Sequence, residues 1–411
     1  MPSLSIDHAG AHGGPAWLEE LRDKAQAELA ACGLPDPSDE VWRYSPIGEL
    51  ELDRFSLADE AAAPSVKLPS SLAAGSAVFE IRAGRATEVT STIPGVSVMP
   101  ASTHPEGAEL VASISGVSES LVALNMANLA DPLIIDVSRG ALVDIPIVLI
   151  HQVPVGASFP RSIIRMGEGS QASVIEVALG GGEGTLNVPV TELDVSDQAI
   201  LRHASIQLLE RGSWHLSTIG ARIGRDATLS QFTAGLGASY DRCRTDAVLA
   251  GQGASSVLRS TYLGDGEQIH DLRTLQDHAA PKTISDLLCK GAVTDSSRSV
   301  YSGLIKVRHG ATRSDAMQTN HNLVLSEAAH ADSVPNLDIK ENDVRCSHAS
   351  TVGPIDEDQR YYLESRGIEP DEAQRLLVRG FFTDLLTKTP MASAAELVGA
   401  EISQRLDGMS R

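Results

Sequence analysis

The sequence has few aromatic residues and few cysteines. Aromatic residues make up 4% of the 411 residues while hydrophobic residues make up 42%, so small aliphatic side chains must build the core of a globular protein. The four cysteines lie far apart and form no C-x-x-C pair. This usage argues against a disulfide-rich secreted protein and favours a reducing cytoplasm.

Long apolar runs, export signals and positive charge are also scarce. No run of about 18 apolar residues is present, so we expect no membrane span, and the N-terminus does not resemble a secretory signal. The chain has 33 Lys and Arg against 54 Asp and Glu, a formal net charge of −21. This excess argues against nucleic acid or an anionic membrane as the main partner.

Common catalytic motifs are missing from the sequence. It has no G-x-x-x-x-G-K-[ST] phosphate loop, because the glycine-rich run at 180–184 lacks the lysine. It also has no G-x-S-x-G nucleophile elbow. Any ATP hydrolysis connected with this chain must therefore come from a partner.

Helical patterns lie near the N-terminus. Apolar residues from Trp17 to Cys32 recur at spacings of three and four, and Gly33 is a plausible C-terminal cap. We interpret Cys32 as a core residue. Farther on, Trp42 and Tyr44 are expected to anchor their segment on the next domain.

Three helices are predicted after residue 355. The first runs from about Asp356 to Gly367, and Pro370 opens the second. The apolar stripe of the second helix is predicted to contain Ala373, Leu376, Leu377, Phe381, Leu385 and Leu386, with Phe382 close by. A capping-box pattern at Ser393 opens the third helix. This part either closes the core domain or docks another subunit.

Between residues 66 and 353 the sequence consists of short β-type runs, apart from a possible helix at 119–129. A polar turn followed by alanine recurs about every 28 residues. The alanines are Ala141, Ala172, Ala199, Ala227, Ala254 and Ala311. One further copy would fall between Asp277 and Lys290. This period predicts a solenoid of stacked β coils with helical segments as end caps, and the alternative is a β-sandwich.

Cys346 and His348 are the strongest candidate for a chemical site. In an extended strand, residues two apart point to the same side. A thiolate beside an imidazole can bind a soft metal, although a Cys-x-His pair alone is a weak signal.

Several segments resemble one family, the SufB/SufD scaffold proteins of the SUF iron–sulfur cluster assembly system. The matching segments are 343–348 (DVRCSH), 351–353 (TVG), 356–359 (DEDQ), 361–363 (YYL), 365–368 (SRGI), 380–382 (GFF), 318–320 (QTN), 322–326 (NLVLS) and 121–125 (LVALN). The segment 40–46 (EVWRYSP) is similar to SufD rather than SufB.

The resemblance implies a mainly β protein, a right-handed parallel β-helix flanked by N-terminal and C-terminal helical segments. It implies a non-enzymatic scaffold subunit that works with a SufB-like paralogue and a SufC-like ABC ATPase. We expect residues 1–65 to form a helical region with a linker, 66–355 the β-helix, and 356–411 a helical domain that docks the ATPase. A homodimer is possible in isolation.

The resemblance also assigns site residues. Cys346 and His348 map to a cluster-assembly interface and would bind a transient iron–sulfur cluster shared with the partner, because a cluster generally needs four protein ligands. This chain alone would hold none stably. One departure is Ala349, where the family usually has glycine. The residues assigned to ATPase docking are Tyr362, Arg366, Gly367, Phe381 and Phe382.

Two other functions remain open at this point. The chain would be a SufB-like primary scaffold if it formed a cluster alone, although more cysteines would then be expected. It would be a polysaccharide-active enzyme if a groove of the solenoid carried catalytic carboxylates.

Overall fold

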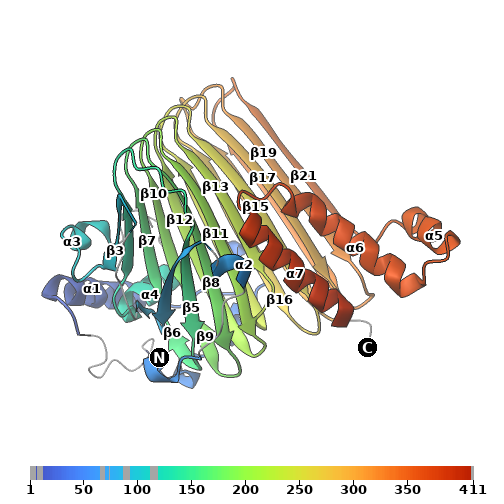
Figure 1. Cartoon of the computed structure of the whole chain (residues 1–411), viewed down its shortest axis with the longest axis horizontal. Coiled ribbons are helices and arrows are strands. Elements are labelled where there is room, and N and C mark those ends of the chain that lie inside the picture. The colour runs from blue at the N-terminus through green and yellow to red at the C-terminus, as the bar shows by residue number, and fades with distance from the viewer. Residues whose placement is uncertain are drawn as a thin grey trace.

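A computed structural model of the chain describes residue 6 and residues 13–64, 70–73, 75–86, 93–111 and 119–408. Two long sheets run through it (Figure 1). The ten-stranded sheet contains, in spatial order, β2 (Arg85–Ala86), β1 (Ala77–Arg82), β5 (Ile147–Val153), β8 (Gln171–Gly181), β11 (Ile200–Glu210), β13 (Thr228–Gly235), β15 (Ser255–Gly264), β17 (Ile284–Val293), β19 (Asp315–Val324) and β21 (Arg345–Gly353).

The eleven-stranded sheet faces the first across the core. Its path contains β20 (His330–Ile339), β18 (Arg298–Val307), β16 (Ile269–His278), β14 (Tyr240–Leu249), β12 (Ser213–Ile223), β10 (Val190–Val195), β7 (Arg161–Met166), β4 (Leu133–Val137) and β3 (Val96–Pro100), with β6 (Gly156–Ser158) and β9 (Thr185–Asn187) beside it. From β4 to β21 successive coils add strands to the two sheets, and the neighbouring strands are parallel. The predicted parallel β-helix is confirmed, and the sandwich alternative is wrong.

One corner of every coil explains the sequence repeat. The strand register places a small residue at the same inward corner of successive coils: Ala141, Ser170, Ala199, Ala227, Ala254, Thr283 and Ser314. The residue before each has positive φ, for example 68° at Gly169 and 58° at Lys282. A left-handed residue therefore turns the chain into the strand, and a small side chain fits the crowded corner.

The sequence repeat was only partly in register with this corner. Ala172 pairs with Leu201 and lies inside its strand, because Ser170 occupies the corner of that coil. Ala311 likewise lies three residues before the corner residue Ser314. The copy missing from the sequence pattern is Thr283, which is as buried as the alanines. Serine and threonine replace alanine because they are small too.

Most helices lie against the solenoid, whereas α5 projects away from it (Figure 1). The α-helices are α1 (Ala16–Cys32), α2 (Ser70–Ala73), α3 (Gly107–Leu110), α4 (Ser120–Asn128), α5 (Glu357–Ser365), α6 (Pro370–Leu386) and α7 (Ala392–Gly408), and the 3-10 helices are η1 (Glu40–Trp42), η2 (Ile47–Glu49), η3 (Leu52–Arg54) and η4 (Glu60–Ala62). The N-terminal region packs on the eleven-stranded sheet, and α6 and α7 pack on the ten-stranded sheet. The expectation that the C-terminal helices cap the solenoid is therefore wrong.

Several predicted helix boundaries hold. The first helix ends at Cys32, and α4 matches the possible helix at 119–129. Asp356 caps α5 by accepting hydrogen bonds from the N–H groups of Asp358 and Gln359. None of the described helices is long and apolar enough to cross a membrane.

Other details of the helices differ from the predictions. Cys32 is exposed, because its position lies at the end of the helix beyond the packed stripe. α7 begins at Ala392, so Ser393 lies inside the helix and not at its cap. The buried residues of α6 are Ala373, Val378, Phe382 and Leu385, which turns Leu376 toward solvent. The predicted domain boundary at 65/66 lies outside the described residues, and the division into three domains stays a prediction.

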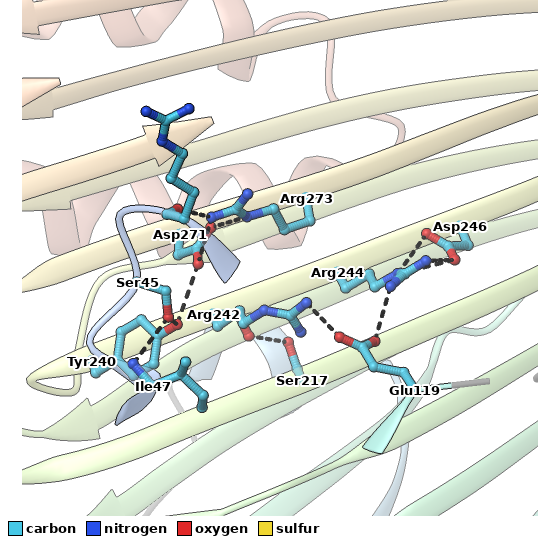
Figure 2. Close-up of polar contacts among 11 residues, drawn as sticks. Ser45, Ile47, Glu119, Ser217, Tyr240, Arg242, Arg244, Asp246, Asp271 and Arg273 are labelled. Atoms are coloured by element: carbon cyan, nitrogen blue, oxygen red, sulfur yellow. Dashed lines mark hydrogen bonds and ion pairs between the residues drawn. The ribbon is translucent and has the colours of Figure 1, made fainter. Parts of the chain in front are cut away.

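A buried charge network joins Glu119, directly before α4, to β14 of the solenoid (Figure 2). Arg242 on β14 has no exposed surface, donates to Glu119 at 2.6 Å, and stacks 3.9 Å from the ring centre of Trp42. Arg244 bridges Glu119 at 3.2 Å and Asp246 at 2.9 Å. Trp42 is thus the anchor that the sequence predicted.

A second group of contacts holds Arg43 and Ser45, which follow Trp42 in the chain, on the solenoid (Figure 2). The hydroxyl of Tyr240 lies 2.7 Å from that of Ser45 and donates to Asp271 at 3.2 Å. Arg273 binds Asp271 at 2.5 Å and donates to the carbonyl oxygen of Arg43 at 3.0 Å. Tyr44, also predicted as an anchor, is exposed instead.

Candidate assembly site at the open end

The two ends of the solenoid differ in how well their core residues are covered. At the N-terminal end, Phe79 and Ile81 on β1 are 6% and 3% exposed. At the C-terminal end, Leu337, Ile339 and Val352 are 38%, 40% and 45% exposed. These three stack on buried residues of the preceding coil, so they occupy interior positions that no described residue covers. We call this surface the open end.

Cys346 and His348 lie side by side at the open end. Both are on β21, where Cys346 pairs with Ala316 and His348 pairs with Gln318 of β19. Because Ala316 and Gln318 are buried interior residues, the two site residues occupy the inward columns of the last coil. The predicted shared face is therefore present, and it forms part of the open end.

The surroundings of the two residues differ. Cys346 packs with an apolar group that contains Ile305, Val307 and Ala316. Burial there raises the pKa of the Cys346 thiol, and the nearby Asp315 carboxylate raises it further. The thiolate is therefore disfavoured in the isolated chain.

The position of His348 is polar in comparison. The amide of Gln318 lies beneath it in the strand register. Next to Gln318, Asn320 donates to Ser333 at 2.8 Å, and the hydroxyl of Ser350 lies 2.6 Å from that of Ser333. His348 is therefore exposed among polar neighbours, whereas Cys346 lies against an apolar group. The segment 318–320 resembles the family in sequence, but its position beneath His348 depends on the strand register, which no local sequence pattern shows.

The described residues contain no complete metal site. No group of three or more His, Cys, Asp or Glu side chains in this part of the chain is arranged to hold a metal ion. Two further cysteines face the solenoid interior: Cys289 is buried and Cys243 is half-buried. Burial raises the pKa of Cys243 to about 11 and that of Cys289 to about 12, so both stay protonated thiols. Cys346 and His348 thus form at most half of a four-ligand site.

The residues assigned to ATPase docking fall into two groups. Tyr362 is exposed on α5, with the Arg366 guanidinium 5.2 Å from its ring centre, and Gly367 follows in a left-handed turn. α5 itself has no buried residue. Phe382, by contrast, is buried between α6 and the ten-stranded sheet.

Phe381 lies between these two extremes. It is half-buried, and the Lys290 ammonium lies 4.8 Å from its ring centre. Lys290 also donates to the Phe381 carbonyl at 3.1 Å and to Asp384 at 2.7 Å, which ties α6 to β17. Hydrogen bonds from Lys290 and Lys388 lower the pKa of Asp384 to about 2, so these pairs persist at neutral pH.

Comparison with known proteins shows which family this chain resembles. The fold defines a parallel β-solenoid protein whose last coil is left exposed. The family described as "SUF system FeS cluster assembly, SufBD core domain" matches residues 149–381. An iron–sulfur cluster assembly SufBD family protein of Mycobacterium tuberculosis is 31% identical over 393 residues, which cover 93% of this chain and 92% of the relative.

Two relatives named SufD give the same result. The iron–sulfur cluster assembly protein SufD of Escherichia coli is 29% identical over 402 residues, covering 93% of this chain and 92% of the relative. SufD of Bacillus subtilis is 25% identical over 418 residues, covering 96% and 95%. The chain belongs to the SufBD family of iron–sulfur cluster assembly proteins. This confirms the resemblance, and it gives no support to the polysaccharide-active alternative.

Proposed function

We propose that this chain is a non-enzymatic scaffold subunit of a cytoplasmic iron–sulfur cluster assembly complex, in which a SufB-like paralogue covers the open end. The observation that carries the proposal is the exposure of Leu337, Ile339 and Val352 around Cys346 and His348. Interior apolar residues that are exposed at the end of a solenoid are typical of a surface that binds a second protein. The partner then supplies the ligands that the half-site lacks, and the cluster is a transient product rather than a resident cofactor.

A SufC-like ABC ATPase docks on the C-terminal helices in this proposal. Tyr362, Arg366 and Gly367 supply the exposed docking surface on α5 and its following turn. Phe381 and Phe382 hold α6 on the sheet, so they support the surface from behind. An exposed tyrosine stacked with an arginine is typical of residues that dominate binding.

The docking surface is tested by pulling down the ATPase with the chain. Tyr362→Ala should weaken the complex about tenfold or more, because truncating such an interface tyrosine costs about 2 kcal/mol. Tyr361→Ala is the matched control, since Tyr361 is exposed on the same helix but points about 100° away. Equal binding by both variants and the wild type would place the ATPase elsewhere.

The cluster site is tested by co-expressing the chain with the paralogue and the ATPase and measuring iron and sulfide in the purified complex. His348→Ala should lower both about tenfold or more, in line with the loss of a ligand. Cys346→Ala should have a smaller effect, because the thiol is protonated over its apolar floor. His309→Ala, on an exposed corner of the preceding coil, serves as control. Wild-type iron and sulfide in the His348 and Cys346 variants would contradict the proposal.

The SufB-like primary scaffold is the alternative within the same family. Reconstitution with iron and sulfide distinguishes the two, because we expect little or no cluster on the isolated chain. A stable cluster on this chain alone would favour the alternative. The same sample also tests whether the open end pairs with a second copy when the paralogue is absent.

A further inference from the structure

The segment Gln318-Thr319-Asn320 lies directly beneath the open end. On β19, Gln318 and Asn320 point into the solenoid and are buried, and Thr319 between them points outward. In the next coil, His348 pairs with Gln318 and Ser350 pairs with Asn320. The two amides thus form the floor on which the outermost polar residues stack.

The amide of Gln318 is buried without a hydrogen-bond partner. Gln318 is 1% exposed, and neither its Oε1 nor its Nε2 atom has a partner among the described residues. Asn320, in contrast, donates to Ser333. A buried polar group without a hydrogen-bond partner destabilises the folded chain. For Gln318, the strand register shows which neighbouring side chain is placed to bind the amide.

The missing side chain at Gly303 leaves room for the Gln318 amide, and the surrounding side chains restrict the position of the amide. A Cβ atom on Gly303 would lie 2.5 Å from Gln318 Nε2 and 2.4 Å from the Tyr301 hydroxyl. Only glycine at 303 therefore lets the amide occupy this place. The amide is held near the interior, with His348 as its neighbour toward the open end.

The register selects His348 as the partner. Paired residues on adjacent strands lie about 4.8 Å apart and project side by side. In a histidine side chain, Nδ1 is the ring nitrogen nearer the backbone, whereas Nε2 lies at the outer end. An amide oxygen next to Nδ1–H fixes the tautomer and leaves the Nε2 lone pair free for a metal.

We propose that Gln318 is a positioning residue for His348: when a partner covers the open end and excludes water, Gln318 Oε1 accepts a hydrogen bond from His348 Nδ1–H. The imidazole is then held with Nε2 directed at the cluster being assembled. This inference rests on the proposed function, because it gives His348 the role of a ligand.

The test uses the complex co-purified with the paralogue and the ATPase. Gln318→Met keeps the volume but removes the acceptor, so iron and sulfide should fall about tenfold or more. In the isolated chain, Gln318→Met should leave the midpoint of thermal unfolding unchanged or higher, since it removes an unsatisfied amide.

A matched control lies deeper in the solenoid. Gln276 is also 1% exposed with both amide atoms unpaired, but Ile305, and not a histidine, pairs with it in the next coil. Gln276→Met should therefore leave iron and sulfide at the wild-type level. In a His348→Ala background, Gln318→Met should cause no further loss.

Three results would overturn the inference. They are a wild-type iron and sulfide content in Gln318→Met, an equal loss in Gln276→Met, or a further loss when Gln318→Met is added to His348→Ala. Unfolding of Gln318→Met would also count against it, because it would make the amide structural. If His348→Ala itself keeps the wild-type content, the proposed function fails; if only Gln318→Met does, the function stands and this inference fails.

Discussion

The polar groups on the face of the solenoid that the N-terminal segments and α4 cover are paired differently from those at the open end. We call this face, which contains the charged residues of Figure 2, the covered face. On the covered face, each buried charge has an opposite charge within reach, as with Arg242 and Glu119 at 2.6 Å. At the open end, an amide is buried without a partner, and His348 stands exposed beside it. The charges of the first region are thus paired within the chain, although Nε and Nη1 of Arg242 have no hydrogen-bond partner among the described residues; at the open end, both polar atoms of the Gln318 amide lack one.

The difference separates structural from functional polar residues. Buried charges persist in a stable fold when they are paired, so the network around Arg242 explains how Glu119 and Trp42 are held against β14. Unpaired groups at the edge of an uncovered core have no such explanation within the chain. We therefore expect substitutions on the covered face to change stability, and substitutions at the open end to change assembly.

The largest effect on stability is expected on the covered face. Glu119→Gln leaves the Arg242 guanidinium buried without its counter-charge, so the free energy of unfolding should fall by about 3–5 kcal/mol. Denaturant unfolding of the purified chain measures it. Arg54→Met breaks an exposed ion pair with Glu51 and should cost less than about 1 kcal/mol. Equal losses in the two variants would mean that the network does not hold the region.

A pair of leucines compares the stacked coils with the open end directly. Leu201 on β11 is fully buried, so Leu201→Ala should lower the free energy of unfolding by about 2–5 kcal/mol. Leu337 is partly exposed in the last coil, so Leu337→Ala should cost about 1 kcal/mol or less and weaken binding of the paralogue instead. Unfolding curves and a binding titration give both values. If Leu337→Ala destabilises the chain as much as Leu201→Ala and leaves binding unchanged, the open end does not differ from the stacked coils in its role.

A buried histidine inside the solenoid predicts that the free energy of unfolding depends on pH. Burial lowers the pKa of His278 to about 4, and the ring lies 2.7 Å from the Thr283 hydroxyl and 2.9 Å from that of Ser285. In the unfolded chain the pKa is about 6.5, so between these values the unfolded state binds more protons. The free energy of unfolding should therefore fall by at most roughly 3 kcal/mol as pH drops from 6.5 to 4. His278→Gln should flatten this slope; an unchanged slope would assign it to other groups.

The sequence predicted the fold well because the coils repeat. A left-handed turn followed by a small residue recurs once per coil, and a single sequence displays such a period. Ala172 and Ala311 were misassigned, because a small residue alone does not reveal strand register. The C-terminal helices were expected as caps, and the sequence cannot show that their apolar stripes match the sheet face instead.

Only the part of the site that depends on the spacing of residues along one strand could be predicted from the sequence. Alternation along a strand placed Cys346 and His348 on one face. The roles of Gln318 and Leu337 depend on contacts between coils about 30 residues apart, so no local pattern reveals them. The resemblance likewise assigned Phe382 to docking, whereas its burial against the sheet gives it a packing role.

The central claim is that a paralogue covers the open end. Hydrogen exchange of the backbone amides of β21, measured with and without the SufB-like paralogue, tests it most directly, at concentrations where the isolated chain is monomeric. The account predicts that residues 345–353 exchange quickly alone and much more slowly in the complex, while β13, inside the stack, is protected in both. Equal exchange of β21 in the two samples would contradict it.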